Sequence, residues 1–265
     1  MSPEAATLRP TIDRVWLEQA AAEDPITHAL ALWDLDHYPD RVQFVSAVRG
    51  ETTLGYLLVW LGHPQVPIVH WVGVREDARV LTGGLPARPL VAIVPEEVGP
   101  DVARVRGPVT AYPLLLLSIE REAVPTATTT PEGIRRLTRG DRPALVALAS
   151  RRGDLVVSEY SSLDPEAETV WGFFEGGRLR ALARAVVRRP SVWIIGGVYV
   201  DPSARGRGLG VAIVQAAIQA GVREARTVAL FVRADRPAAR AVYERAGFRP
   251  LGRRVWLDAG ADLEP

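Results

Sequence analysis

Several residue types are missing from this sequence or nearly so. It contains no cysteine, no lysine and no asparagine, and it has one methionine. Without cysteine there can be no disulfide, no thiol nucleophile and no cysteine-ligated metal. All 32 basic side chains are arginine. Such a bias is typical of a GC-rich genome, whereas adaptation to high temperature usually brings more lysine. The bias therefore indicates the source more than the function.

Long apolar runs and an excess of one charge are also absent. No run approaches the ~20 apolar residues that span a bilayer, and residues 1–5 lack the basic and then apolar pattern of a signal peptide. The net charge is +1, so no bulk field favours nucleic acid. We expect a cytoplasmic, soluble protein, monomeric or homodimeric, with neither a nucleic-acid nor a membrane partner.

A threonine-rich segment with two prolines, residues 123–131, interrupts the chain. Proline lacks a backbone donor and restrains the residue before it, so this segment predicts an extended linker. We therefore expect a first domain at residues 1–122, the linker at 123–131, and a second domain at 132–265.

Apolar periodicity and turn residues predict the elements of the second half. Helices are expected at residues 141–150, 209–223 and 237–246. Strands are expected at residues 134–137, 168–175, 179–187, 192–200, 227–232, 248–251 and 254–257, the last two pairing with each other. This order predicts an α/β fold with a mixed sheet and helices on it (an α+β mixed sheet).

The first half has a similar order of elements. Its expected helices are residues 12–22, 26–35, 76–81 and 98–104, and its expected strands are residues 42–48, 54–61, 68–74, 90–94 and 110–119. Two halves with one element order indicate a tandem repeat of one fold, although the two sequences share little.

A glycine-rich loop follows the apolar strand at 192–200. It reads Arg205-Gly206-Arg207-Gly208-Leu209-Gly210 and opens the helix expected at 209–223. Backbone N–H groups at a helix start favour a phosphate, and glycine lets a ligand approach the backbone. Arginine adds fork-shaped donors that suit phosphate oxygens. A plain turn with solvated arginines would have the same composition, so the loop alone does not decide the function.

The spacing of these glycines excludes two common nucleotide sites. A dinucleotide fingerprint needs G-x-G-x-x-G directly after a strand, whereas here the spacing is G-x-G-x-G and Asp201 to Arg205 intervene. A P-loop needs a lysine, and the chain has none. Both NAD and ATP are therefore disfavoured.

Two motifs together resemble the GNAT superfamily of N-acetyltransferases. The family's coenzyme A loop, Arg/Gln-x-x-Gly-x-Gly/Ala, is matched by Arg205, Gly208 and Gly210. Its downstream motif, which ends in Leu-Tyr-x-x-x-Gly-Phe, is matched by residues 236–248, with Val242 in the leucine position before Tyr243. The resemblance covers residues 132–258; for residues 1–122 it rests on element order alone. It implies the GNAT acyl-CoA N-acyltransferase fold, in two tandem copies with the N-terminal copy degenerate.

The resemblance implies acetyl-CoA as co-substrate and assigns residues to it. The pyrophosphate would lie on the loop, whose members are Arg205, Gly206, Arg207, Gly208, Leu209, Gly210 and Val211. Main-chain groups of Val198 and Val200 would hold the pantetheine arm, where the strand splays from its parallel neighbour. Gly196 and Gly197 could mark that distortion, or they could only pack under a bulky side chain.

The same resemblance implies direct attack of a neutral amine on the thioester. A backbone N–H near Val198 would stabilise the oxyanion, and Tyr243 would protonate the thiolate. The general base is not evident. We take Glu159 as the candidate, with Glu175 or a water chain as alternatives, although an exposed glutamate is usually just solvated.

Arg236 departs from the family pattern, which prefers asparagine there. Arginine cannot accept a hydrogen bond. Arg236 could instead reach a phosphate, or the neighbouring Asp235 could take over the asparagine's role. We include Arg236 among the cofactor-binding residues.

The first half lacks the glycine row. Its equivalent segment is residues 72–78, and Glu76 and Asp77 at the helix start would repel a phosphate. We predict that this half binds no coenzyme A. All four histidines, His28, His37, His63 and His70, lie in this half without ligand spacing, and we expect no metal site.

The sequence thus predicts an enzyme, an N-acetyltransferase that moves an acetyl or other acyl group from coenzyme A to a primary amine of a small-molecule or amino-acid-like acceptor. Two alternatives stay open. One is a non-catalytic acyl-CoA sensor, motivated by the missing base and by Arg236. The other is an acetyltransferase for protein or peptide amines.

Overall fold

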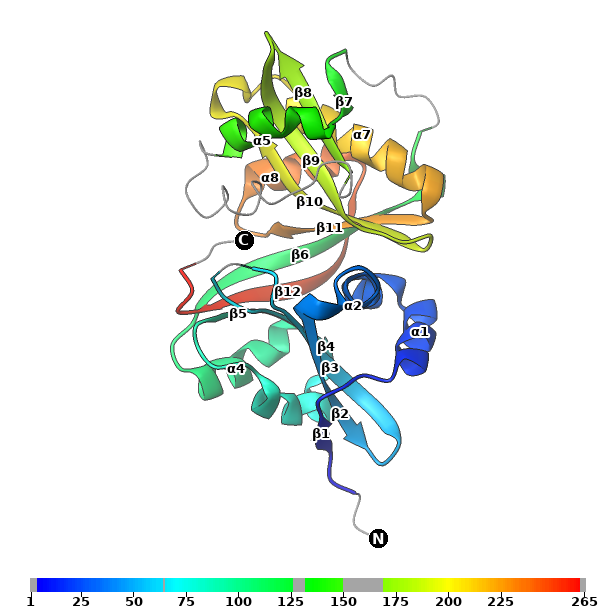
Figure 1. The fold of residues 1–265 in the computed structure, drawn as a ribbon, viewed down its shortest axis with the longest axis vertical. Coiled ribbons are helices and arrows are strands. Elements are labelled where there is room, and N and C mark those ends of the chain that lie inside the picture. The colour runs from blue at the N-terminus through cyan, green and yellow to red at the C-terminus, as the bar shows by residue number, and fades with distance from the viewer. Residues whose placement is uncertain (1–3, 64, 126–131, 150–168, 263–265) are drawn as a thin grey trace. The chain divides into compact units, whose positions relative to one another are not determined.

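The computed structural model describes residues 4–63, 65–125, 132–149 and 169–262. Chain contacts divide it into two units, described separately below (Figure 1). The first unit comprises Met1–Leu116, Arg233–Asp235 and Gly252–Pro265, and the second comprises Leu117–Val232 and Arg236–Leu251. Among the described residues, no helix is long and apolar enough to cross a membrane.

The second unit is a mixed sheet in the order β11-β10-β9-β8-β7. Strands β7 to β10 pair antiparallel, and β10 and β11 pair parallel. The strands are β7 (Ile134–Arg136), β8 (Val170–Glu175), β9 (Arg178–Arg188), β10 (Val192–Val200) and β11 (Thr227–Arg233). The helices are α5 (Arg142–Ala149), α7 (Leu209–Glu224) and α8 (Pro237–Ala246).

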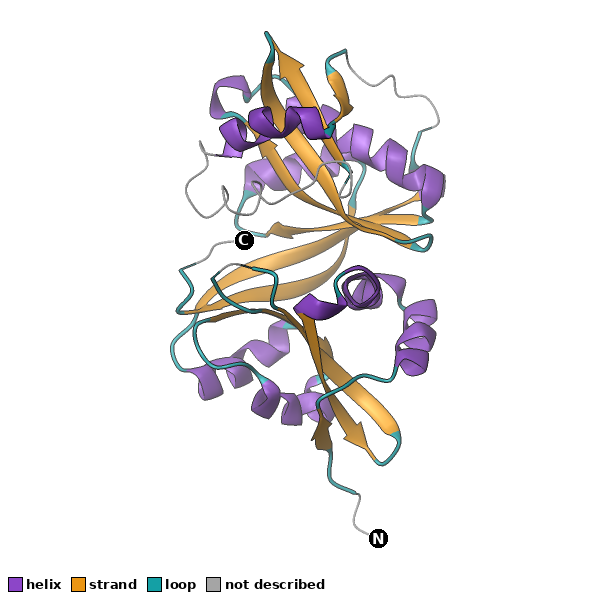
Figure 2. Cartoon of the chain, in the orientation of Figure 1, coloured by secondary structure: helices purple, strands orange, loops and turns teal. Residues whose placement is uncertain are grey.

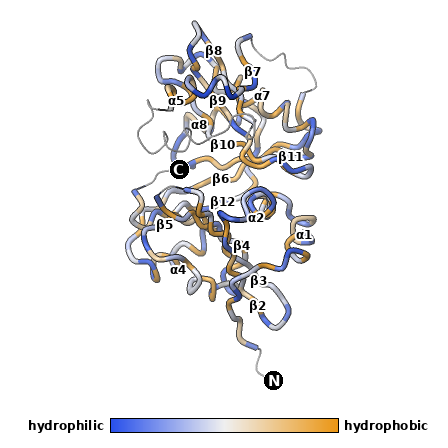
Figure 3. Tube along the Cα trace, in the orientation of Figure 1, coloured by the Kyte–Doolittle hydropathy of each residue, from blue (hydrophilic) through white to orange (hydrophobic). Residues whose placement is uncertain are grey.

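Apolar residues fix these elements locally. The first four residues of β10 are buried, and its apolar run shows as hydrophobic colouring in Figure 3. Helix α5 packs on one face of the sheet through Leu145 and Leu148. On α7, a Cβ at Gly221 would lie 2.7 Å from Val228 Cγ2, so this glycine lets the helix approach β11 closely. The sheet is thereby covered by helices.

The first unit repeats this arrangement in the order β1-β2-β3-β4-β5-β12, in which β12 is Arg249–Ala259. Its strands β2 to β4 pair antiparallel, and β4 and β5 pair parallel, as β10 and β11 do in the second unit. The strands are β1 (Thr7–Arg9), β2 (Val42–Arg49), β3 (Thr52–Trp60), β4 (Ile68–Gly73) and β5 (Leu90–Val94). The helices are α1 (Arg14–Glu23), α2 (Pro25–His37), α3 (Arg75–Ala78) and α4 (Gly99–Arg106). Strand β6 (Thr110–Glu120) runs from the first unit into the second.

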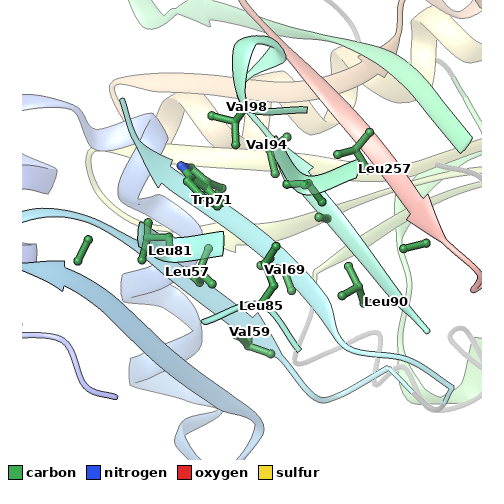
Figure 4. Close-up of a cluster of buried hydrophobic side chains, with 14 residues drawn as sticks. Leu57, Val59, Val69, Trp71, Leu81, Leu85, Leu90, Val94, Val98 and Leu257 are labelled. Atoms are coloured by element: carbon green, nitrogen blue, oxygen red, sulfur yellow. The ribbon is translucent and has the colours of Figure 1, made fainter. Parts of the chain in front are cut away.

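Successive residues of β3 point to opposite faces of the first sheet, as the twofold period of a strand requires. Tyr56 and Leu58 belong to a core cluster with residues of α1 and α2. Leu57 and Val59 belong to another cluster with Trp71 and with residues near α4 (Figure 4). The sheet is therefore buried on both faces, with α1 and α2 on one and α4 on the other (Figure 2).

The C-terminal strand corrects one prediction. The two short strands expected at 248–251 and 254–257 form one strand, β12 (Arg249–Ala259), and do not pair with each other. Gly252 has no left-handed dihedral angle that would turn the chain between them. Residues Val255–Ala259 pair antiparallel with β5. Residues 252–265 therefore fall in the first unit, whereas the sequence placed them in the second domain.

Candidate active site

Strand β10 separates from its parallel neighbour before it ends. Its pairs with β11 run from Val192↔Thr227 to Ile195↔Leu230. The strand then continues to Val200, and its residues from Gly196 onward are half-buried rather than buried. The splay that the sequence led us to expect therefore begins at Gly196.

A β-bulge accompanies this splay on the other side of β10. Gly196 pairs with Arg184 and Tyr199 pairs with Leu182, so β10 has one more residue than β9 in this interval. Gly197 adopts φ +59°, an angle that glycine tolerates best. A Cβ at Gly196 would lie 3.1 Å from Val186 Cγ1. Both interpretations of the glycine pair thus hold, because Gly197 forms the bulge and Gly196 allows close packing.

The loop after β10 exposes its backbone at two glycines. Gly206 and Gly208 have φ +77° and +79°, and a Cβ at either would meet nothing within 4 Å. Helix α7 begins at Leu209, with Gly208 as an N-cap that offers no capping side chain. The first-turn amides of a helix have no intrahelical acceptor. This loop therefore leaves donors and open space at the start of a 16-residue helix.

Gly210 has a different role from the two glycines before it. A Cβ there would lie 3.2 Å from Val242 Cγ2 of α8. Gly210 thus brings the first turn of α7 close to α8, the helix that carries Tyr243.

The two arginines of the loop are held differently. Arg205 Nε donates to the carbonyl oxygen of Val200 at 3.2 Å. Arg207 donates from both terminal nitrogens to Glu175, at 3.1 Å to Oε2 and 2.5 Å to Oε1. The Arg207 hydrogen bonds lower the pKa of Glu175, and the same bonds raise the pKa of Arg207. Glu175 is therefore held as a carboxylate, which makes it a weaker candidate for the general base.

A second set of polar contacts ties the loop to the sheet. Asp201 is buried, and its Oδ1 accepts from Ser203 N at 2.9 Å and from Ser203 Oγ at 2.7 Å. Its Oδ2 accepts from Arg180 at 3.4 Å. Sequence reasoning gave Asp201 no role, although an aspartate two residues before a serine is a recognisable turn signal. These contacts fix the point from which the glycine loop departs.

Tyr243 lies in the last part of α8 and is buried. Arg236 is the N-cap of that helix and makes no side-chain capping bond. Asp235 is the alternative to Arg236 for the role of the family's asparagine. Its carboxylate accepts from Arg233 Nε at 2.9 Å and from Arg233 Nη2 at 2.6 Å. The proposed catalytic residue Glu159 lies outside the described residues.

The corresponding segment of the first unit is arranged differently. After β4 the chain forms a helix of four residues, α3, without a glycine loop. Arg75 at its start donates to Asp101 Oδ2 at 2.6 Å, and Arg104 donates to Asp101 Oδ1 at 2.8 Å. Asp101 is buried. The arginine that follows β4, Arg75, is thus already paired with a carboxylate of the chain, that of Asp101.

Three of the histidines have hydrogen-bond partners, and His63 Nδ1 accepts from the amides of Gln65 and Val66 at 3.4 Å. His28 Nδ1 lies 2.9 Å from the Tyr56 hydroxyl, and His37 Nδ1 lies 2.9 Å from the Trp33 carbonyl oxygen. Within the ranges that the structure describes, no group of three or more His, Asp or Glu side chains could hold a metal ion.

The fold and this site define a mixed-sheet protein whose splayed strand leads through a glycine loop into a long helix. Residues 135–248 match the family model described as the Acetyltransferase (GNAT) family. This segment is therefore a GNAT domain, as its motifs predicted.

Known proteins resemble the chain in sequence and in fold. Mycothiol acetyltransferase from Nocardia farcinica (strain IFM 10152) is 34% identical over 118 residues, which are 43% of this chain and only 38% of that protein. A Drosophila protein of known structure has a TM-score of 0.70 at 19% identity, covering 96% of this chain and 98% of its own.

A tandem GNAT protein from the clavulanic acid biosynthesis pathway has a TM-score of 0.61 at 16% identity, covering 97% of this chain and 99% of its own. At these identities the two solved structures show the fold alone. They support the mixed-sheet GNAT fold in tandem copies.

Proposed function

We propose that the chain is an N-acetyltransferase that uses acetyl-CoA and acetylates a primary amine of a small-molecule or amino-acid-like acceptor. One observation carries this proposal. Gly206 and Gly208 both have left-handed dihedral angles and open space beside them, immediately before α7. Such a loop lets a phosphate approach the backbone amides at a helix start. Membership of residues 135–248 in the GNAT family supports the same cofactor.

The loop fits the phosphates of coenzyme A in both donors and charge. Main-chain amides of Leu209, Gly210 and Val211 belong to the first turn of α7, where an anion is stabilised by the helix dipole. Arg205 and Arg207 supply positive charge at the same loop. Arg236, at the start of α8, is the third candidate.

The end of β10 would hold the pantetheine arm. Its residues from Gly196 to Val200 lie beyond the parallel pairs with β11 and are half-buried. Main-chain groups of Val198 and Val200 would bond the amides of the arm, as one more strand bonds a sheet edge.

Acetyl-CoA would supply the acetyl group as an activated thioester. A backbone N–H near Val198 would donate to the carbonyl oxygen on which negative charge develops. Tyr243 would donate a proton to the departing sulfur. The amine must be neutral to attack, and Glu159 remains the candidate that accepts its proton. The curated relative is a mycothiol acetyltransferase, which supports a small-molecule acceptor for this chain.

The test is calorimetric titration of acetyl-CoA into the wild type and into Gly208→Glu, with desulfo-CoA and NADH as comparators. We expect micromolar binding of both coenzyme A species by the wild type, no binding of NADH, and loss of binding in the variant. The new side chain would put a carboxylate and a Cβ into the open space of the loop. A thiol-release assay over a panel of amines then separates an enzyme from an acyl-CoA sensor.

Gly50→Glu is the matched control. Gly50 has φ +59° in the β2–β3 turn of the first unit, so the variant adds comparable backbone strain and the same charge away from the loop. It should bind acetyl-CoA as the wild type does. If the folded wild type binds no coenzyme A species, the acetyltransferase proposal fails.

A further inference from the structure

We propose that Glu175 competes with the phosphates of coenzyme A for Arg207, and thereby weakens cofactor binding. The inference rests on the function proposed above. It assigns a role to a residue that belongs neither to the glycine loop nor to the downstream motif.

The contact between the two side chains uses the end-on face of the Arg207 guanidinium, which its two terminal nitrogens form. Both terminal nitrogens donate to Glu175, one to each carboxylate oxygen. A phosphate prefers the same bidentate geometry on a guanidinium. A phosphate that binds this end-on face of Arg207 therefore has to displace Glu175 from it.

This ion pair is placed where it can open. The side chains of Arg207 and Glu175 are 48% and 40% exposed, so water can solvate both when they separate. The neighbouring pair is different, because the side chains of Arg180 and Asp201 are 19% and 4% exposed. Of these two pairs, the buried one anchors the loop and the exposed one can exchange its partner.

Glu175 would not be left without a partner after the exchange. Arg180 Nε lies 3.8 Å from Glu175 Oε2. Arg180 thus lies close to two carboxylates, those of Asp201 and Glu175. The carboxylate can turn to Arg180 when Arg207 turns to a phosphate, which lowers the cost of the exchange.

The backbone around both residues suits such an exchange. Gly206 and Gly208 flank Arg207 with open space at each Cβ position, so no side chain on either neighbour blocks rotation of the arginine. Glu175 ends β8 just before the Gly176-Gly177 turn. In the strand register it lies opposite Arg178 of β9. The arginine is therefore carried by a permissive loop and the carboxylate by a paired strand end.

The first unit has a closed version of the same arrangement. Arg75 follows β4, as the glycine loop follows β10, and its partner Asp101 is buried with a side chain only 2% exposed. A phosphate that displaced Asp101 from Arg75 would leave the carboxylate buried, away from water, with Arg104 as its remaining close donor. The two ion pairs thus differ in the exposure of their carboxylates. The buried Arg75–Asp101 pair is lasting, whereas the exposed Arg207–Glu175 pair can exchange its partner.

The experiment is a double-mutant cycle on coenzyme A affinity, measured by calorimetry at low, fixed salt. The variants are Glu175→Gln, Arg207→Gln and the double variant. Exposed ion pairs are weak, so we expect Glu175→Gln to bind coenzyme A about two- to fivefold more tightly than the wild type. In the Arg207→Gln background the same substitution should change the affinity little, because the guanidinium for which Glu175 and a phosphate compete is then absent.

Glu224→Gln is the control for charge removal. Glu224 is exposed at the last position of α7, at the opposite end of the helix from the loop, and its variant should bind as the wild type does. Circular dichroism melting verifies that each variant is folded.

Two results would overturn the inference while leaving the proposed function intact. One is unchanged or weaker binding by folded Glu175→Gln beside normal binding by the wild type. The other is a gain of equal size in the Arg207→Gln background, which would indicate general charge repulsion. Absence of binding by the wild type itself would overturn the proposed function, and this inference with it.

Discussion

The ring of Tyr243 meets the ring of Phe248 edge to face, with centroids 6.1 Å apart. The main chain reinforces this contact, because Phe248 N donates to the Tyr243 carbonyl oxygen at 3.0 Å. Gly247 between them adopts φ +104° and ends α8. The tyrosine ring is thus fixed by packing against Phe248 and by the helix cap.

Tyr243→Phe should therefore separate chemistry from folding. The ring contact with Phe248 is retained, so the free energy of unfolding should change by no more than about 1 kcal/mol. If the hydroxyl donates the proton to sulfur, kcat should fall about a hundredfold while KM for acetyl-CoA changes little. Steady-state thiol release and urea unfolding measure the two effects. A kcat within twofold of wild type would show that Tyr243 is a packing residue only.

Gly197→Ala should affect both the fold and the activity. Alanine in the left-handed region costs about 1–2 kcal/mol, and φ at Gly197 is +59°. Relief of this strain would shift the backbone of the bulge beside Val198, whose main chain we propose to hold the pantetheine arm. We therefore expect a loss of kcat/KM larger than the loss of stability explains.

Gly50→Ala is the control for the strain, because Gly50 has the same φ of +59° in a turn of the first unit and its new Cβ would meet only the end of the Glu4 side chain, at 3.2 Å. Unfolding curves should show the same loss of stability in both variants. Thiol-release rates should fall in Gly197→Ala and not in Gly50→Ala. Equal activities would indicate that the bulge is not needed for the reaction.

Local signals explain why much of the second unit could be predicted. The bounds expected for β10 and α8 are those that the structure has, because an apolar β-branched run and a proline-to-glycine helix pattern mark them. Strand β1 was missed, since its three residues are exposed and carry no apolar pattern. The GNAT motif likewise depends on short-range spacing, and the family match confirms it.

Long-range pairings could not be predicted in the same way. Nothing near Val255 indicates that β12 pairs with β5, more than 150 residues earlier in the chain. Glu175 and Arg207 are 32 residues apart, and only the hairpin and the loop together bring them into contact. Charged residues on exposed loops are usually solvated, so no pattern in the sequence indicates that these two side chains pair.

Asp101→Asn should destabilise the first unit in a pH-dependent way. Hydrogen bonding to Arg75 lowers the pKa of Asp101 below its ordinary value of 3.8. A carboxyl group with a depressed folded pKa stabilises the fold fully above its unfolded pKa, and this contribution is lost as pH falls through the folded value. At about pH 7 we expect the variant to lose about 1–3 kcal/mol of unfolding free energy. The difference should shrink below about pH 4.

Urea unfolding of both proteins at the two pH values measures this difference. Glu97→Gln is the control, because Glu97 is exposed and lies four residues away. A loss of stability that is the same at both pH values would show that shape, and not charge, holds Arg75 and Arg104 near Asp101.

Asp34→Asn should stabilise the protein, whereas Asp101→Asn should destabilise it. Asp34 is buried in α2, and burial raises its pKa from 3.8 to about 7. The folded protein therefore holds a proton that the unfolded chain releases between about pH 4 and 7, so stability from this group falls as pH rises through that window. At a pH where Asp34 is ionised in both the folded and the unfolded protein, its buried charge lowers the unfolding free energy by roughly 4 kcal/mol, from about 1.4 kcal/mol for each pKa unit.

Asparagine has nearly the same shape but cannot ionise, so it removes this cost. We expect Asp34→Asn to be more stable than the wild type at about pH 8 and close to it at about pH 4, in urea unfolding followed by fluorescence. Asp36→Asn, which removes a partner of Arg14 at 2.7 Å, should instead lose a little stability at about pH 8. If Asp34→Asn were no more stable than the wild type at the higher pH, the carboxylate of Asp34 would have to be solvated or paired in the folded protein.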